Sequence, residues 1–138
     1  MTWSDGLDDG SLPVIDYRVT VKTEAGVHVV TASSLLTKQY TARSLSLGVN
    51  YIFTVEARNS YGYSNLSEAL TLLCAIKPSA PTNVLTTNVG PDALVTWTPG
   101  SANGSPITAY RIYIKTASNT YVEELTNCDG SSSEVVSS

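Results

Sequence analysis

The sequence predicts an all-β fold, an antiparallel β-sandwich, from three observations. Apolar and polar residues alternate with a period of two, and no segment keeps the spacing of an amphipathic helix over three turns. Turn-forming pairs such as Asp9-Gly10 and Asn103-Gly104 separate the alternating segments. Ser and Thr supply 35 of the 138 residues, whereas charged residues make up only 14%. Short strands with frequent turns are typical of two packed sheets.

Three segments show the alternation most clearly. Residues 14–22 have a polar face and an apolar face, and the apolar face holds Ile15, Tyr17, Val19 and Val21. In residues 51–58 the apolar face consists of Tyr51, Phe53, Val55 and Ala57. Residues 107–115 repeat the pattern of residues 14–22. We expect three half-buried antiparallel strands, each with one face in a core and one in water.

Composition argues against several classes of function. The formal net charge is −4 and the pI about 4.7, whereas nucleic-acid binding needs clustered Lys and Arg to replace the counterions of phosphates. No apolar run approaches the roughly 20 residues of a membrane span. Two Cys and one His leave little material for a metal site or a nucleophile–base pair. We therefore predict no cofactor, no metal site, no nucleic-acid partner and no membrane span in this segment.

An internal repeat organises the chain. Trp3 and Trp97 are 94 residues apart, and Tyr17 and Tyr110 are 93 apart. The surrounding strings also match, as in Met1-Thr2-Trp3 against Val95-Thr96-Trp97. This period has the length of one small β-sandwich. Between the repeats lies a short segment with Pro78 and Pro81, which we expect to be stiff and extended.

These residues resemble the fibronectin type III family. A Trp, a Pro-led strand and a Leu-x5-Tyr corner followed by an alternating strand occur in order in the first repeat: Trp3, Pro13 to Val21, Leu45, Tyr51, Phe53, Val55, Ala57, Asn59, Gly62 and Ser64. The second repeat has the opening Pro81-Thr82-Asn83-Val84, then Trp97, Pro106 and Tyr110. The resemblance implies an immunoglobulin-like sandwich in two tandem copies.

Both copies are expected to be incomplete. Residues 1–74 form a first domain without strand A, residues 75–80 a linker, and residues 81–138 the N-terminal part of a second domain. Met1 aligns with Val95 and is expected to be an internal residue of strand B, facing the core like Trp3. The chain is then expected to be a fragment of a longer array, with the missing strands before Met1 and after Ser138.

The predicted core follows from the shared strand phase and the repeat. In the first domain it includes Trp3, Ile15, Tyr17, Val19, Leu45, Tyr51, Phe53, Val55 and Ala57, and in the second Trp97 and Tyr110. The Tyr51 hydroxyl is expected to turn back to the backbone before its strand, in the tyrosine corner of sandwich folds.

Candidate catalytic and metal-binding residues are few. His28 has no nucleophile in a recognisable elbow beside it, so we interpret it as an ordinary strand residue. Asp5, Asp8 and Asp9 offer oxygen ligands for Ca²⁺, but Asp-Gly pairs are common turn chemistry and no bidentate Glu completes an EF-hand. We therefore predict that the chain is not an enzyme.

Two further positions bear on the compartment. Asn65-Leu66-Ser67 is a candidate glycosylation site, whereas Pro106 follows the second sequon at Asn103 and disfavours it. Cys74 and Cys128 could pair, stay free or bond to other cysteines. The Cys128-Asp129-Gly130 stretch resembles loops in long repeat proteins of the cell surface or cilia of unicellular eukaryotes, where a second Cys follows shortly. That resemblance implies a bond from Cys128 to a cysteine after Ser138.

The resemblance leaves two main classes of function open. The first is a non-catalytic structural or interaction module, a repeat unit of a large extracellular, cell-surface or cilium-associated filament or adhesion protein. The second is an accessory module of a larger enzyme or receptor, and an intracellular filament array is a third possibility. In the first case the partners are other proteins, including neighbouring repeats or filament subunits, and the location is extracellular or at the cell surface.

Overall fold

The computed structural model describes residues 1–125 and 130–136 and divides the chain into two compact units. The N-terminal unit is Met1–Ile76 and the C-terminal unit is Lys77–Ser138. The described residues form only β-strands and loops, apart from the short helix α1 (Ser133–Val136). The assignment of residues 1–74, 75–80 and 81–138 to a domain, a linker and a second domain stays a prediction.

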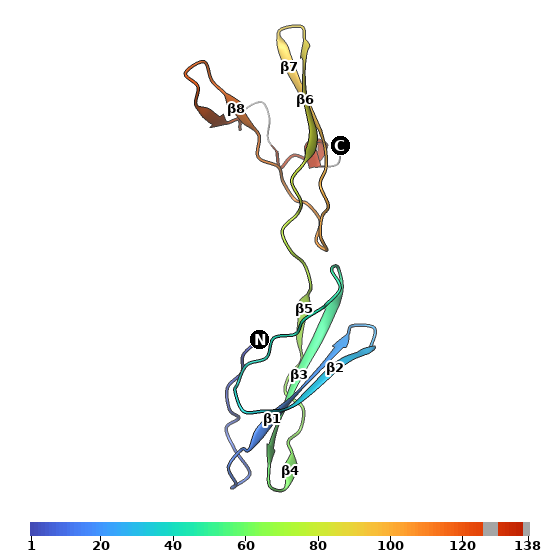
Figure 1. The fold of residues 1–138 in the computed structure, drawn as a ribbon, viewed down its shortest axis with the longest axis vertical. Coiled ribbons are helices and arrows are strands. Elements are labelled where there is room, and N and C mark those ends of the chain that lie inside the picture. Colours follow the sequence, from blue (N-terminus) through green and yellow to red (C-terminus); the bar gives the residue numbers. More distant parts are fainter. Residues whose placement is uncertain (126–129, 137–138) are drawn as a thin grey trace. The chain divides into compact units, whose positions relative to one another are not determined.

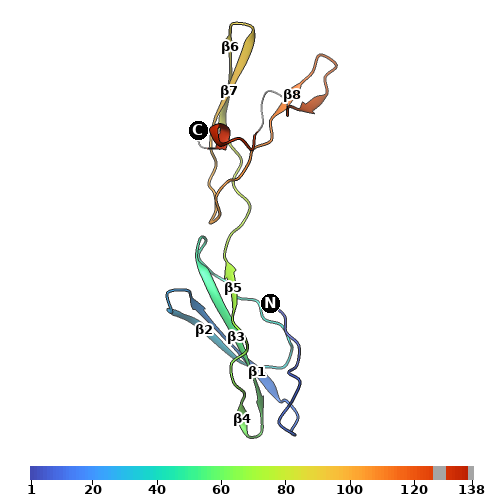
Figure 2. The same ribbon diagram turned by 180° about the vertical axis from the view of Figure 1, so that it is seen from behind.

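One antiparallel sheet dominates the N-terminal unit (Figures 1 and 2). Its strands are β1 (Asp16–Thr23), β2 (His28–Leu35), β3 (Asn50–Asn59), β4 (Gly62–Tyr63) and β5 (Leu70–Leu73). The order is β2-β1-β3-β4, and β5 also pairs with β3. Because β1 and β3 pair without interruption over eight residues, the apolar faces predicted for these two segments lie side by side.

A much smaller layer lies against this sheet. Thr2 forms an isolated antiparallel bridge with Gln39. The Trp3 N–H donates to the Lys38 carbonyl at 3.1 Å, and the Tyr40 N–H donates to the Met1 carbonyl at 3.0 Å. Residues 1–3 and 38–40 therefore form the short second layer of the sandwich.

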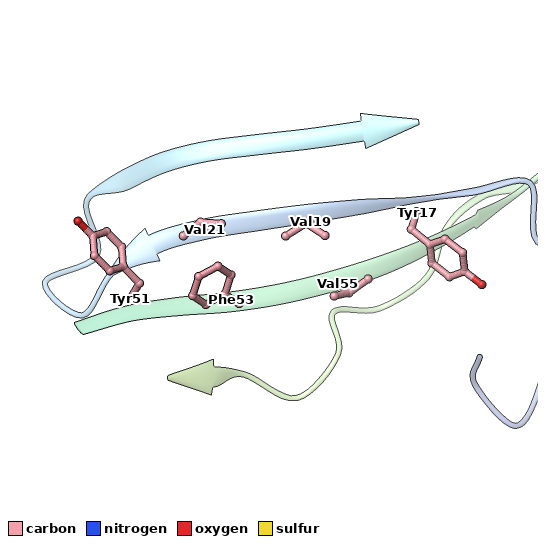
Figure 3. Close-up of a cluster of buried hydrophobic side chains, with 6 residues drawn as sticks. All are labelled: Tyr17, Val19, Val21, Tyr51, Phe53 and Val55. Carbon is pink, nitrogen blue, oxygen red and sulfur yellow. The ribbon is translucent and has the colours of Figure 1, made fainter. Parts of the chain in front are cut away.

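The hydrophobic core lies on one face of β1 and β3 (Figure 3). Val19 and Val21 are fully buried, while Tyr17, Tyr51, Phe53 and Val55 are at most 8% exposed. The two tyrosines close opposite ends of the row, with their hydroxyl groups directed away from it (Figure 3). Partly buried residues pack against this cluster, including Met1, Trp3, Leu45, Ala57 and Cys74.

Ile15 departs from the sequence prediction, because it is 52% exposed rather than part of the core. Its N–H donates to the Arg58 carbonyl at 2.7 Å, so it lies just beside the end of the sheet. Alternation places Ile15 on the same face as Tyr17. The layer that covers this face ends before it reaches Ile15, which instead lines an open groove.

The C-terminal unit contains two separate two-stranded sheets in its described residues. The first pairs β6 (Thr82–Val89) with β7 (Asp92–Thr98), and the second pairs β8 (Tyr113–Lys115) with β9 (Tyr121–Glu123). Trp97 and Tyr110 are half-buried and lie with ring centroids 5.1 Å apart. All eight residues of β6 are exposed.

The strand predicted for residues 107–115 is mostly wrong, since only Tyr113–Lys115 is a strand. The Tyr110 N–H donates to the Gly130 carbonyl at 2.9 Å, and the Ile112 carbonyl accepts from Glu124 at 3.0 Å. These residues thus bond outside a regular ladder. Alternation produces a strand only where a partner strand takes up the main-chain hydrogen bonds.

Candidate functional site

The outer face of the N-terminal sheet carries a paired charge network. Arg18 on β1 donates twice to Glu56 on β3, at 2.8 Å and 2.6 Å. Arg58 on β3 donates to both oxygens of Asp16 on β1, at 2.8 Å for its Nε atom. These fork-to-fork pairs bond β1 to β3 through side chains as well as through the main chain.

Tyr63 on β4 completes this network. The Arg18 guanidinium carbon lies 3.8 Å from the centre of the Tyr63 ring, and that of Arg58 lies 5.7 Å from it. Both distances are within the range of cation–π attraction. The hydrogen bonds of Arg58 lower the pKa of Asp16, and those of Glu56 raise the pKa of Arg18. Each charge in this network therefore already has a partner within the sheet.

A second polar cluster lies at the end of the core face. Asp5 accepts short hydrogen bonds from the Tyr17 hydroxyl and from Lys38. Burial of the ring, together with the bond to Asp5, raises the pKa of Tyr17 to about 12. The bond from Lys38, followed by that from Tyr17, lowers the pKa of Asp5. The cluster ties the loop after Trp3 to β1 and to the second layer.

The residues considered for chemistry have structural partners. The Gly10 N–H donates to Asp8 at 2.8 Å, which is ordinary turn geometry. His28 is exposed at the start of β2, with Nε2 2.8 Å from the Thr31 hydroxyl. Within the described part of the chain, no cluster of three or more His, Cys, Asp or Glu side chains could hold a metal ion. Asp5, Asp8 and His28 thus form no common site.

The predicted core residues occupy several environments. Tyr17, Tyr51 and Phe53 are buried, while Trp3 and Leu45 pack partly buried against them. The Ser46 N–H donates to the Tyr51 hydroxyl at 2.9 Å, which is the expected return to the backbone before the strand. The Trp3 and Tyr17 rings meet edge to face, with centroids 5.4 Å apart.

Of the predicted glycosylation site and the two cysteines, the structure describes Asn65 and Cys74. Asn65 is exposed between β4 and β5, so a glycan could reach it. Cys74 is a free thiol that packs against the core. Cys128 lies outside the described residues, and its disulfide to a cysteine after Ser138 stays a prediction.

A groove of about 1090 Å³ opens beside the core of the N-terminal unit. Its walls come from the N-terminal segment, from β3 and from the chain between β4 and β5. Trp3, Ile15, Phe53, Val55 and Leu70 give it an apolar lining. The Trp3 indole nitrogen is buried and has no acceptor among the described residues. Charged side chains, among them Asp5, Lys38 and Glu68, share the lining with these apolar residues.

Three features define the fold of the N-terminal unit: its strand topology, its tyrosine corner and its Trp–Tyr pair. A family model for the fibronectin type III domain matches residues 1–72. The chain belongs to the fibronectin type III family. Domains of this family are in general non-catalytic and act as structural or protein-interaction modules. Among the described residues, no helix has the length and apolar character needed to cross a membrane.

Sequence reasoning did not identify the charge network around Tyr63. Its four charged residues, Asp16, Arg18, Glu56 and Arg58, lie on the polar faces of the two alternating segments, and the alternation alone does not say which of them pair. The signal was available, because Asp16 and Arg18 stand at alternate positions in one strand, as Glu56 and Arg58 do in the other, and alternate residues face the same side. Pairing these four residues required knowledge that β1 and β3 are neighbours in this register, with Arg18 opposite Glu56 and Asp16 opposite Arg58.

Proposed function

We propose that the chain is a non-catalytic structural and interaction module, a repeat unit of a large extracellular or cell-surface filament or adhesion protein. The main support is its membership of the fibronectin type III family. Its partners are then other proteins, including neighbouring repeats or filament subunits. Cilium-associated proteins are a further expectation, carried by the Cys128 stretch alone.

The electrostatics of the N-terminal unit support a structural role. The carboxyls with lowered pKa, Asp5 and Asp16, are held by Lys38 and Arg58. An acid or base in catalysis needs a pKa near the working pH and access to a substrate. Here the pKa values of both carboxyls are lowered by hydrogen bonds that hold the fold together. These shifts therefore support a structural role for the two carboxyls and not a catalytic one.

The position of Asn65 supports a surface or extracellular location. The sequon lies on an exposed connection between two strands, and N-glycosylation requires such accessibility in the secretory pathway. An accessory module of a larger enzyme or receptor is the alternative, and it shares this feature. An intracellular filament array would leave Asn65 unmodified.

Antibodies raised against the chain test the location on intact cells of the source organism. We expect labelling without permeabilisation, together with a glycan on the Asn65 peptide by mass spectrometry. Labelling only after permeabilisation, with an unmodified Asn65, would contradict the extracellular proposal and favour the intracellular array. The domains encoded next to this segment then show whether the whole protein is an adhesion or filament protein, or an enzyme or receptor.

A further inference from the structure

A loop of the C-terminal unit binds the proline-containing segment that begins this unit. The unit starts at Lys77, and its loop of residues 100–104, here called the clasp loop, follows β7. The Ser79 N–H donates to the Ser101 carbonyl at 2.9 Å. The side-chain amide of Asn103 donates to the Lys77 carbonyl at 2.8 Å. The main chain on both sides of Pro78 is therefore bonded to one loop.

Gly100 allows the clasp loop to approach this segment closely. A Cβ atom at Gly100 would collide with the Ser79 carbonyl group and would lie 2.8 Å from the Ala80 carbonyl oxygen. Both obstacles are main-chain atoms, which cannot rotate away as a flexible side chain could. The contact is thus backbone against backbone, and only glycine fits at this position.

The turn that carries Asn103 orients its side chain. Asn103 has a φ of 51° and Gly104 a φ of 94°, and Asn and Gly adopt this left-handed backbone more readily than other residues. The Ser101 hydroxyl donates to Asn103 Oδ1 at 2.8 Å. Because Oδ1 is held by Ser101, the amide nitrogen is directed to the Lys77 carbonyl.

Proline restricts the bound segment further. Pro78 and Pro81 have a fixed φ and no N–H. Lys77 and Ala80 each precede a proline, which favours extended conformations for them. Once Ser79 is bonded to the clasp loop, this segment has little conformational freedom left.

Two residues lie between this bound segment and the last bonded residue of the N-terminal unit. The Cys74 N–H donates to the Val49 carbonyl at 3.0 Å, and the Cys74 carbonyl accepts from Gly48 at 2.8 Å. Ala75 and Ile76 make no hydrogen bond to any described residue, and Ile76 is 62% exposed. The chain is therefore held on each side of Ala75 and Ile76, and by a different unit on each side.

We propose that the clasp loop confines the bending between the two units to Ala75 and Ile76. Residues 77–81 then move with the C-terminal unit, so the flexible joint is shorter than the predicted linker of residues 75–80. A shorter flexible segment gives the two units fewer arrangements to sample. The clasp thus keeps successive units of the chain under a tighter constraint than the two prolines alone would. This inference goes beyond the proposed function and holds for any location or partner of the protein.

Amide hydrogen exchange and ¹⁵N relaxation of the whole chain test the clasp. The amide hydrogens of the segment belong to Ala75, Ile76, Lys77, Ser79 and Ala80, and that of Ser79 alone has an acceptor among the described residues. We expect slower exchange at Ser79 than at Lys77 and Ala80. Relaxation should show fast internal motion at Ala75 and Ile76 and not at Ser79 or Ala80. Exchange at Ser79 as fast as at Ala80, or equal motion from Ala75 to Ala80, would overturn the proposal.

A pair of variants separates the clasp from a general effect of the substitution. Asn103→Asp keeps the size of the side chain, but a carboxylate has no N–H to donate to the Lys77 carbonyl. Asn119→Asp is the matched control, because Asn119 also has a positive φ, 67°, and its side chain makes no hydrogen bond in the described part of the chain. Asn103→Asp should speed exchange at Ser79 about tenfold, the effect of one lost hydrogen bond. Asn119→Asp should leave it unchanged, and equal effects of the two variants would overturn the role of Asn103.

Gly100→Ala tests the close approach independently of the hydrogen bonds. Gly100 has no positive φ, so alanine does not strain the loop itself, but its methyl group collides with the main chain of Ser79. We expect fast internal motion to spread from Ala75 to Ala80, while the amide signals of β8 and β9 stay unchanged. A Ser79–Ala80 segment as ordered as in the unaltered chain would overturn the contact between loop and linker.

Discussion

The two units form the same aromatic pair in different surroundings. Trp3 and Tyr17 pack above a sheet whose neighbouring residues Val19 and Val21 are fully buried. Trp97 and Tyr110 form a similar pair, yet the buried apolar residues in the described chain all belong to the N-terminal unit. The difference is β3, which pairs with all eight residues of β1. Local alternation is enough to bring a Trp and a Tyr together, but a core needs a central strand that binds neighbours on both edges.

The largest expected difference between the units comes from truncating a side chain of β3. Phe53→Ala should lower the free energy of unfolding of the N-terminal unit by about 3–5 kcal/mol, because it removes a buried ring and leaves a cavity. Leu94→Ala in β7 should cost about 0.5 kcal/mol or less, since Leu94 is 53% exposed. Urea unfolding measures the cost of Phe53→Ala. The readout is the fluorescence of Trp3 in a Trp97→Phe background, so that only the N-terminal unit contributes to the signal. Equal costs would show that the C-terminal unit has a core of its own.

The tyrosine corner distinguishes the N-terminal unit by a single hydrogen bond. Tyr51→Phe removes the acceptor of the Ser46 N–H and should cost about 1–2 kcal/mol of stability. Tyr61→Phe is the matched control, because Tyr61 is 92% exposed. Thermal or urea unfolding should separate the two variants. Identical stability would mean that water replaces the Tyr51 hydroxyl without loss.

These strands also show how far the sequence alone predicts the molecule. The apolar faces of residues 14–22 and 51–58 were predictable, since a period of two assigns each side chain to a face. Ile15 was not, because the pattern does not say where the covering layer ends. The same limit applies to residues 107–115, where an alternating segment finds a strand partner only from Tyr113 onward. The groove beside Leu70 and the network around Tyr63 depend on which strands are neighbours, and that information is non-local.

A smaller effect is expected from the aromatic centre of the charge network. Tyr63→Leu keeps an apolar side chain on β4 but removes the ring on which Arg18 stacks at 3.8 Å. The loss should be about 0.5–1 kcal/mol, the range of exposed cation–π pairs. Tyr61→Leu, in the turn before β4, serves as the control. A double-mutant cycle with Arg18→Met isolates the interaction, and additive losses would show that the stacking does not contribute.

The smallest expected effect is the acid sensitivity of the two lowered carboxyls. Asp16 and Asp5 have lowered pKa values in the folded chain because Arg58 and Lys38 donate to them. A carboxyl with a depressed folded pKa stabilises the fold fully above its unfolded pKa, and this contribution disappears as the pH falls through the folded pKa.

The unfolding midpoint of the N-terminal unit should therefore decrease below about pH 4, near the ordinary carboxyl pKa. Asp5 is exposed and Arg58, the partner of the buried Asp16, is 38% exposed, so solvent screens both pairs in part and the decrease should be modest. Asp16→Asn should flatten the acid side of the profile, whereas Asp92→Asn in the C-terminal unit should leave it unchanged. An unaltered profile in Asp16→Asn would show that the bonds to Arg58 hold the strands in register without making their stability depend on pH.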